Sequence, residues 1–86
     1  MTYTVFWRPL AEQQLARLWT NAADRQEIAS VADSIDSYLR FDAETKGESR
    51  SGRTRILFTS PLVVLFQVNE EDRTVYVTAV GRSRRE

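Results

Sequence analysis

The residues best suited to chemistry are cations, gathered in two segments of the chain. The first segment, residues 46–55, also contains two glycines, which take up positive φ without steric cost and so allow a tight, exposed turn. Because arginine stays protonated, such side chains can hold a phosphate or carboxylate but cannot accept a proton. The pattern therefore predicts anion binding. The cations are Lys46, Arg50, Arg53 and Arg55 in the first segment and Arg82, Arg84 and Arg85 in the second.

Proton transfer at such a site would fall to Lys46 or Glu48. Neighbouring cations disfavour the charged form of a lysine, which makes Lys46 the better candidate base. Cleavage of RNA through the 2′-hydroxyl needs a base, an acid and cations that stabilise the phosphate, and this sequence supplies mainly the cations. The alternative is a solvated turn in which Lys46 and Glu48 form a weak surface ion pair. Binding of an anion or acidic partner by residues 46–55 is therefore favoured over catalysis.

Composition narrows the classes of protein that fit. The 86 residues suit one domain, residues 1–86. They include no Cys and no His, which removes disulfides, thiolate metal sites and the usual neutral base, so we expect no metal and no cofactor. No stretch is long and apolar enough to span a membrane, and a soluble, cytoplasmic protein is expected. The net charge of the whole chain is zero, but residues 1–45 carry a net charge of −3 and the remaining residues one of +3. Such a separation of charge suits an anionic partner on one side of the molecule.

Hydrophobic periodicity predicts a strand followed by two helices. Residues 3–7 are β-branched and aromatic, as in a short strand, and Pro9 suits the first turn of a helix over residues 9–20. Asp24 stands three residues before Glu27, which is typical of a helix start. The second helix then shows one apolar stripe that we expect to pack against a sheet. The stripe consists of Ile28, Val31, Ala32, Ile35 and Leu39.

The remaining chain predicts three strands. Residues 56–58, 62–68 and 73–80 are apolar or alternating, with turns at 59–61 and 69–72, and Gly81 is expected to end the last strand. The element order β-α-α-β-β-β indicates an α+β fold, an antiparallel sheet covered on one face by an antiparallel helix pair. The amino-terminal strand must pair with a sheet edge. Both cationic segments are expected near the helix-free face.

In this order the sequence resembles the RelE/ParE superfamily of toxins from bacterial type II toxin-antitoxin modules. Nearly the whole chain takes part, through pieces that are weak alone and moderately specific together. They are residues 7–11, 12–19, 35–39, 46–48, 52–55, 61–68, 72–75 and 80–82.

The resemblance implies a small toxin that a partner antitoxin neutralises, with possible roles in plasmid stabilization and assembly into a heterotetramer or larger complex. RelE-like members resemble ribosome-dependent messenger RNA endoribonucleases (mRNA interferases), whereas ParE-like members inhibit DNA gyrase. For an RNA-binding site, residues 46–55 match the basic loop and second strand of the family, and Arg82 matches the arginine after its last strand. The catalytic candidates are then Lys46, Glu48, Arg53 and Arg82, and the anion-binding candidates Arg50, Arg55, Arg84 and Arg85.

Two departures favour the alternatives to a nuclease. The central strand begins with the apolar pair Leu62 and Val63 where the family usually has an arginine, and the chain ends at Glu86 with no terminal tyrosine or histidine. A ParE-like protein-binding inhibitor of gyrase is one alternative, and a non-catalytic member that only binds an antitoxin is the other. Arg84 and Arg85 could also be a tail without fixed structure.

The predicted helix over residues 9–20 offers the candidate antitoxin-binding residues, Leu15 and Trp19. An aromatic ring left partly exposed there could anchor an antitoxin segment, although core packing is the alternative. Among the tyrosines, Tyr76 is the one to examine, because Tyr3 and Tyr38 suit packing positions.

Overall fold

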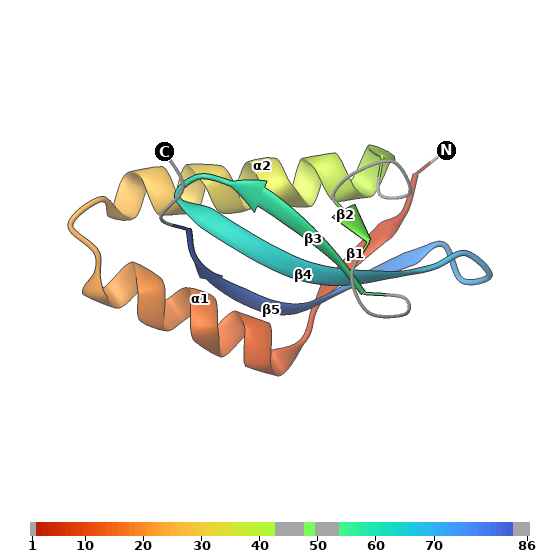
Figure 1. The fold of residues 1–86 in the computed structure, drawn as a ribbon, viewed down its shortest axis with the longest axis horizontal. Coiled ribbons are helices and arrows are strands. Elements are labelled where there is room, and N and C mark those ends of the chain that lie inside the picture. The colour runs from red at the N-terminus through yellow and green to blue at the C-terminus, as the bar shows by residue number, and fades with distance from the viewer. Residues whose placement is uncertain (1, 43–47, 50–53, 84–86) are drawn as a thin grey trace.

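The computed structural model describes residues 2–42, 48–49 and 54–83, and these form an α+β fold in the predicted order, with one short strand inserted (Figure 1). The first helix ends one residue later than predicted, and all three carboxyl-terminal strands extend beyond the predicted limits. The elements are β1 Thr4–Trp7, α1 Pro9–Asn21, α2 Arg25–Asp42, β2 Glu48–Ser49, β3 Thr54–Thr59, β4 Leu62–Asn69 and β5 Thr74–Arg82.

The sheet has five strands in the order β1-β5-β4-β3-β2. Strands β3, β4 and β5 form the antiparallel meander predicted from the sequence, and β2 adds to the outer edge of β3. The amino-terminal strand does pair with a sheet edge, but β1 runs parallel to β5, so the sheet is mixed and not wholly antiparallel. The alternating pattern of β1 places its side chains on two faces but contains no information on strand direction.

Both helices cover the same face of the sheet and run in opposite directions (Figure 1). Strand β4 alternates buried and half-buried positions, and its buried side chains Leu62, Val64 and Phe66 face the helices. The stripe of α2 meets them through Ile28 and Leu39, both with no exposed surface. Each such side chain contributes about 1.5–3 kcal/mol when fully buried, so this layer supplies most of the stability.

A short turn joins the two helices. Arg25 closes the end of α1, because its Nε donates to the carbonyl of Trp19 at 3.1 Å and its Nη2 to that of Thr20 at 2.9 Å. The backbone of Asp24 accepts the first hydrogen bond of α2, from the amide of Ile28 at 3.1 Å. The predicted start of the second helix at Asp24 is therefore confirmed to within one residue.

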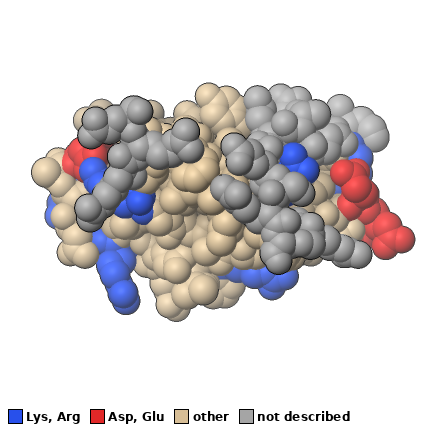
Figure 2. Space-filling model, viewed as in Figure 1, with Lys and Arg blue, Asp and Glu red and all other residues tan. Residues whose placement is uncertain are grey.

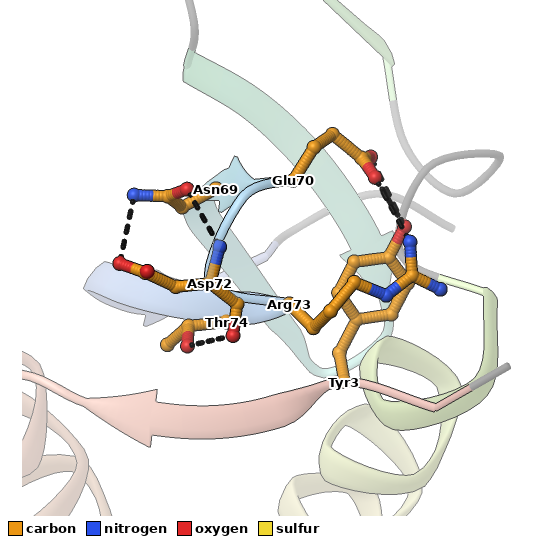
Figure 3. A network of polar contacts seen from close by, with 6 residues as sticks. All are labelled: Tyr3, Asn69, Glu70, Asp72, Arg73 and Thr74. Carbon is orange, nitrogen blue, oxygen red and sulfur yellow. Dashed lines mark hydrogen bonds and ion pairs between the residues drawn. The ribbon is translucent and has the colours of Figure 1, made fainter.

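The chain before β1 links α2 to the β4–β5 hairpin (Figure 3). The amide of Tyr3 donates to the carbonyl of Arg40 at 2.7 Å, and its buried ring extends toward the hairpin. The Tyr3 hydroxyl lies 3.0 and 3.2 Å from the two carboxylate oxygens of Glu70, while the guanidinium of Arg73 stacks over the ring and pairs with the same carboxylate. Arg73 holds a positive φ of 50°, which turns the hairpin back into β5.

Strand β5 does not end at Gly81, contrary to the prediction. Gly81 pairs with Val63 and Arg82 with Leu62, and the amide of Ser83 donates to the carbonyl of Pro61 at 2.8 Å. The pairing continues because β4 begins directly at the turn and supplies partners there. Within the described ranges, no helix is long and apolar enough to cross a bilayer.

Candidate functional site

Most of the cations predicted to bind anions lie outside the described residues. This holds for Lys46, Arg50 and Arg53 and for Arg84 and Arg85 at the carboxyl end. The backbone of Glu48 belongs to β2 and pairs with Ile56, and its side chain is also outside the description. The roles assigned to these six residues therefore stay predictions.

Arg55 and Arg82, the two described members of the set, differ from the expected placement. Arg55 lies opposite Phe66 and Arg82 opposite Leu62, and directly opposed residues of neighbouring strands project from the same face. Since Phe66 and Leu62 face the helices, both arginines project from the helix-covered side and not from the helix-free one. The register also sets their Cα atoms about 16 Å apart, from a rise of ~3.3 Å per residue and a strand spacing of ~4.8 Å. The expected placement near the helix-free face is therefore wrong for both arginines.

Arg82 already has an anionic partner. Its Nη2 donates to the Asp24 carboxylate at 2.8 Å, which ties the end of β5 to the turn before α2. This hydrogen bond lowers the pKa of the Asp24 carboxyl below its usual value, and the same carboxylate raises the pKa of the Arg82 guanidinium. Arg82 is therefore charged but locally neutralised.

The sheet face without helices, the open face, is largely apolar over the residues that the structure describes. Its strand positions alternate with the buried ones, and their aliphatic and aromatic side chains lie opposite one another in adjacent strands. In the view of Figure 2, uncharged surface occupies much of the middle of the part that is not grey, and arginine side chains lie mostly toward its margins. Among the apolar residues of this face, Phe58 is exposed and the others are half-buried. The apolar residues of the open face are Ile56, Phe58, Val63, Leu65 and Ala79.

At the β1 end of the open face stands a cluster that combines a cation with aromatic rings. The guanidinium carbon of Arg8 lies 4.7 Å from the centroid of the Tyr76 ring, and Phe6 meets that ring edge-on at 5.9 Å. The parallel register of β1 and β5, with Phe6 opposite Tyr76, brings these side chains together. Within the described chain, Arg8 is thus a cation held by a ring instead of a carboxylate.

The predicted antitoxin-binding residues, Leu15 and Trp19, lie together in a groove between α1 and α2, with a volume of about 740 Å³. Its floor includes Ile28 and Ala32, and Trp19 is 45% exposed. Arg25 stacks over the Trp19 ring at 4.8 Å and limits its motion. The rim carries Glu12, Asp33 and Asp36. No group of three or more acidic side chains in the described residues is arranged to hold a metal ion.

Comparison with known proteins identifies the family. Residues 5–86 match the family described as the ParE toxin of the type II toxin-antitoxin system parDE. The chain belongs to this family of toxins. The ParE-family fold is also seen in solved structures, although no curated protein sequence matches the chain.

Two solved complexes show the likeness of the ParE-family fold. One is the toxin-antitoxin complex RelBE2 from Mycobacterium tuberculosis, with a TM-score of 0.79 and 19% identity over 99% of this chain and 95% of that one. The other is the chromosomal ParDE system from P. aeruginosa, with a TM-score of 0.76 and 14% identity over 96% of this chain and 98% of that one. At these identities the likeness establishes the fold alone, and it extends to both RelE and ParE proteins.

Sequence reasoning did not single out Arg8 of this ParE-family chain as a candidate binding residue. Arg8 comes directly before Pro9, so the sequence indicates only that it precedes a helix. Tyr76 draws attention in the sequence without any indication of a partner. Only the parallel pairing of β1 with β5 brings the two into contact. The sequence does offer one indication of the cluster, the alternation of side chains along β1. This alternation puts Phe6 on the face opposite to Val5 and Trp7.

Proposed function

We propose that this toxin acts by binding a protein target, DNA gyrase, and not by cutting messenger RNA. The observation that carries the proposal is the apolar open face, where Val63 and Leu65 stand in the central strand. A surface that cleaves RNA needs several cations against the phosphates and a pair of groups that transfer protons. A half-buried apolar surface bordered by polar groups instead suits a protein interface.

The placement of Arg82 supports the same proposal. An arginine that stabilises a cleaved phosphate must present its donors to the substrate, whereas Arg82 donates to Asp24 on the helix-covered side. Messenger RNA cleavage at the ribosome is the second candidate. It depends on Lys46, Glu48 and Arg53, which lie outside the described residues. Both targets are cytoplasmic, and we place the toxin there.

We propose further that an antitoxin neutralises the toxin by placing an amphipathic helix in the groove between α1 and α2. The groove is open, mainly apolar and lined by residues of both helices, which are features of grooves that receive an amphipathic helix. Trp19 provides the large aromatic surface that dominates most protein interfaces.

The test combines a gyrase supercoiling assay with mapping of messages in a cell-free translation system. We expect the purified toxin to inhibit supercoiling and to leave messages intact. Leu65→Glu, which places a charge in the centre of the open face, should lose inhibition, while Gln13→Glu on the exposed side of α1 serves as the matched control. Circular dichroism of both variants checks that they fold. Shortened messages with normal supercoiling would overturn the proposal in favour of the nuclease.

A further inference from the structure

The cluster around Arg8 has the geometry of a binding site. The Tyr76 ring positions the guanidinium of Arg8, and the edge of Phe6 supports the ring from the other strand. A stacked guanidinium keeps its planar donors available and loses less conformational freedom when a ligand binds. Arg8 is exposed, so its donors reach the solvent.

The donors of Arg8 are uncommitted in the described part of the chain. Arg40, Arg73 and Arg82 each pair with a carboxylate there, whereas the Arg8 guanidinium makes only the ring contact. Among the described residues, no acid lines the cavity of about 270 Å³ beside it, which is formed by Arg8, Gln67, Val68, Asn69 and Tyr76.

Gln67 adds a second donor to this cavity. Its Nε2 carries two hydrogens, and Thr54 Oγ1 accepts one of them at 3.3 Å. Gln67 lies directly opposite Tyr76 in the sheet, so its amide and the Arg8 guanidinium flank the same ring. Among the described residues, this cavity is thus lined by one cation, Arg8, and otherwise by uncharged side chains. Its volume suits a small ligand.

The charge of the site selects the ligand. A planar guanidinium matches a carboxylate through two parallel hydrogen bonds. A nucleic acid backbone presents a row of phosphates and needs a row of cations, but Arg8 is the one cation that the described residues place on the open face. The adjoining surface is apolar and includes Leu65 and Ile56. A single carboxylate flanked by apolar side chains fits this surface better than a polyanion.

We propose that Arg8, Tyr76 and Gln67 form a site for one aspartate or glutamate carboxylate of the target protein. The proposal rests on the proposed function in that the toxin binds a protein through its open face. Arg8 holds the carboxylate, and Gln67 is the second donor to it. The apolar residues beside that acid in the target protein pack against the apolar strand residues of the open face.

The experiment uses nuclear magnetic resonance of the full-length, ¹⁵N-labelled protein with three probes. They are the blocked peptide acetyl-Leu-Asp-Leu-amide, its Asn counterpart and a uridine trinucleotide. We expect the Asp peptide to shift the Nε–H signal of Arg8 and the side-chain amide of Gln67 in a saturable way. The Asn peptide should bind at least ten times more weakly. Arg8→Gln should abolish the shifts, Tyr76→Leu should weaken them, and Arg17→Gln on exposed α1 should preserve them.

The outcomes separate this site from the function on which it rests. Equal shifts with the Asn peptide, no shifts at Arg8 and Gln67, or tighter binding of the trinucleotide would each overturn the carboxylate site. Supercoiling assays then compare the native protein with Arg8→Gln. If the native protein inhibits gyrase and the variant inhibits it equally, the site does not serve that target and the proposal fails. If the native protein leaves gyrase active while the Asp peptide binds at Arg8, the site stands and the gyrase assignment fails.

Discussion

The guanidinium of Arg82 lies 2.8 Å from the carboxylate of Asp24, and this ion pair joins the last strand to the turn between the helices. The arginine that the sequence offers as a candidate anion contact is thus engaged within the protein. The pair connects the helix pair to the carboxyl end of β5.

The ion pair makes part of the free energy of unfolding depend on pH. The pKa of Asp24 is lower in the folded protein than in the unfolded chain, where it is about 3.9. The contribution is therefore fully present above that unfolded value and is lost as the pH falls through the lower folded one. Thermal unfolding of the native protein and Asp24→Asn between neutral pH and about pH 2.5 should give a difference that disappears in acid. A difference that persists at the lowest pH would contradict this origin. Both groups are partly exposed, so added salt should reduce the effect.

Truncation of the central core residue should be severe. Phe66 has no exposed surface and packs between the sheet and both helices, so Phe66→Ala should lower the free energy of unfolding by about 3–5 kcal/mol. Leu10→Ala, at an exposed position of α1, should change it by less than about 0.5 kcal/mol. Urea denaturation followed by circular dichroism measures both. Similar losses from the two variants would mean that Phe66 is not part of the core.

The hydroxyl of Tyr3 should contribute through its bond to Glu70. Tyr3→Phe keeps the buried ring but removes one donor to the carboxylate, which still pairs with Arg73, and we expect the free energy of unfolding to fall by about 0.5–1.5 kcal/mol. Glu70→Gln tests the same contact from the other side. In a double-mutant cycle the two losses should sum to more than the loss of the double variant, and strict additivity would show that the contact contributes nothing.

Gln14 should contribute to stability, because its side chain lies outside the sheet and accepts a hydrogen bond from a strand amide. Its side-chain oxygen accepts a hydrogen bond from the amide of Val80 at 2.8 Å, beyond the point where β1 stops pairing with β5. Gln14→Ala would leave this half-buried donor without a partner, at a cost of about 1–2 kcal/mol. Gln13→Ala, one residue away and exposed, is the control. Hydrogen exchange at the Val80 amide should accelerate in the first variant alone, and unchanged protection there would argue against the contact.

Trp19 should be a principal residue for antitoxin binding. If an antitoxin helix occupies the groove between α1 and α2, Trp19→Ala should weaken the complex by about 30-fold or more, equivalent to ~2 kcal/mol. Leu10→Ala removes a similarly exposed apolar side chain outside the groove and should change affinity less than about twofold. Isothermal titration calorimetry with the purified antitoxin measures both. Equal affinity for Trp19→Ala and the native toxin would place the antitoxin elsewhere.

The elements of the fold could be predicted from the sequence because each rests on local periodicity. The helix start at Pro9, the buried alternation around Val64 and the hairpin before Thr74 all follow from residues within a few positions of one another. The direction of β1 could not be predicted in this way, since it depends on which strand edge remains free after the meander forms.

The candidate site was harder to predict for the same reason. Leu15 and Trp19 line one groove because they share one helix face, and their role in antitoxin binding stays a prediction. Arg55 and Arg82 were assigned to the wrong face, because the face of a strand residue depends on register, and β5 contains an irregularity opposite Leu65 and Phe66 that composition does not reveal. The contact of Arg8 with Tyr76 joins residues from opposite ends of the chain and has no local signal.

The parallel pairing of β1 with β5 also constrains when the protein can become a toxin. Thr4 and Thr74 are partners, so the first strand to leave the ribosome must wait for the last before the sheet can close. Until then Val5 and Trp7 lack the strand that positions them over the core, and the nascent chain exposes apolar surface to proteases. A message truncated before the codon for Thr74 should therefore yield a degradable fragment, and toxicity should begin only with completed chains.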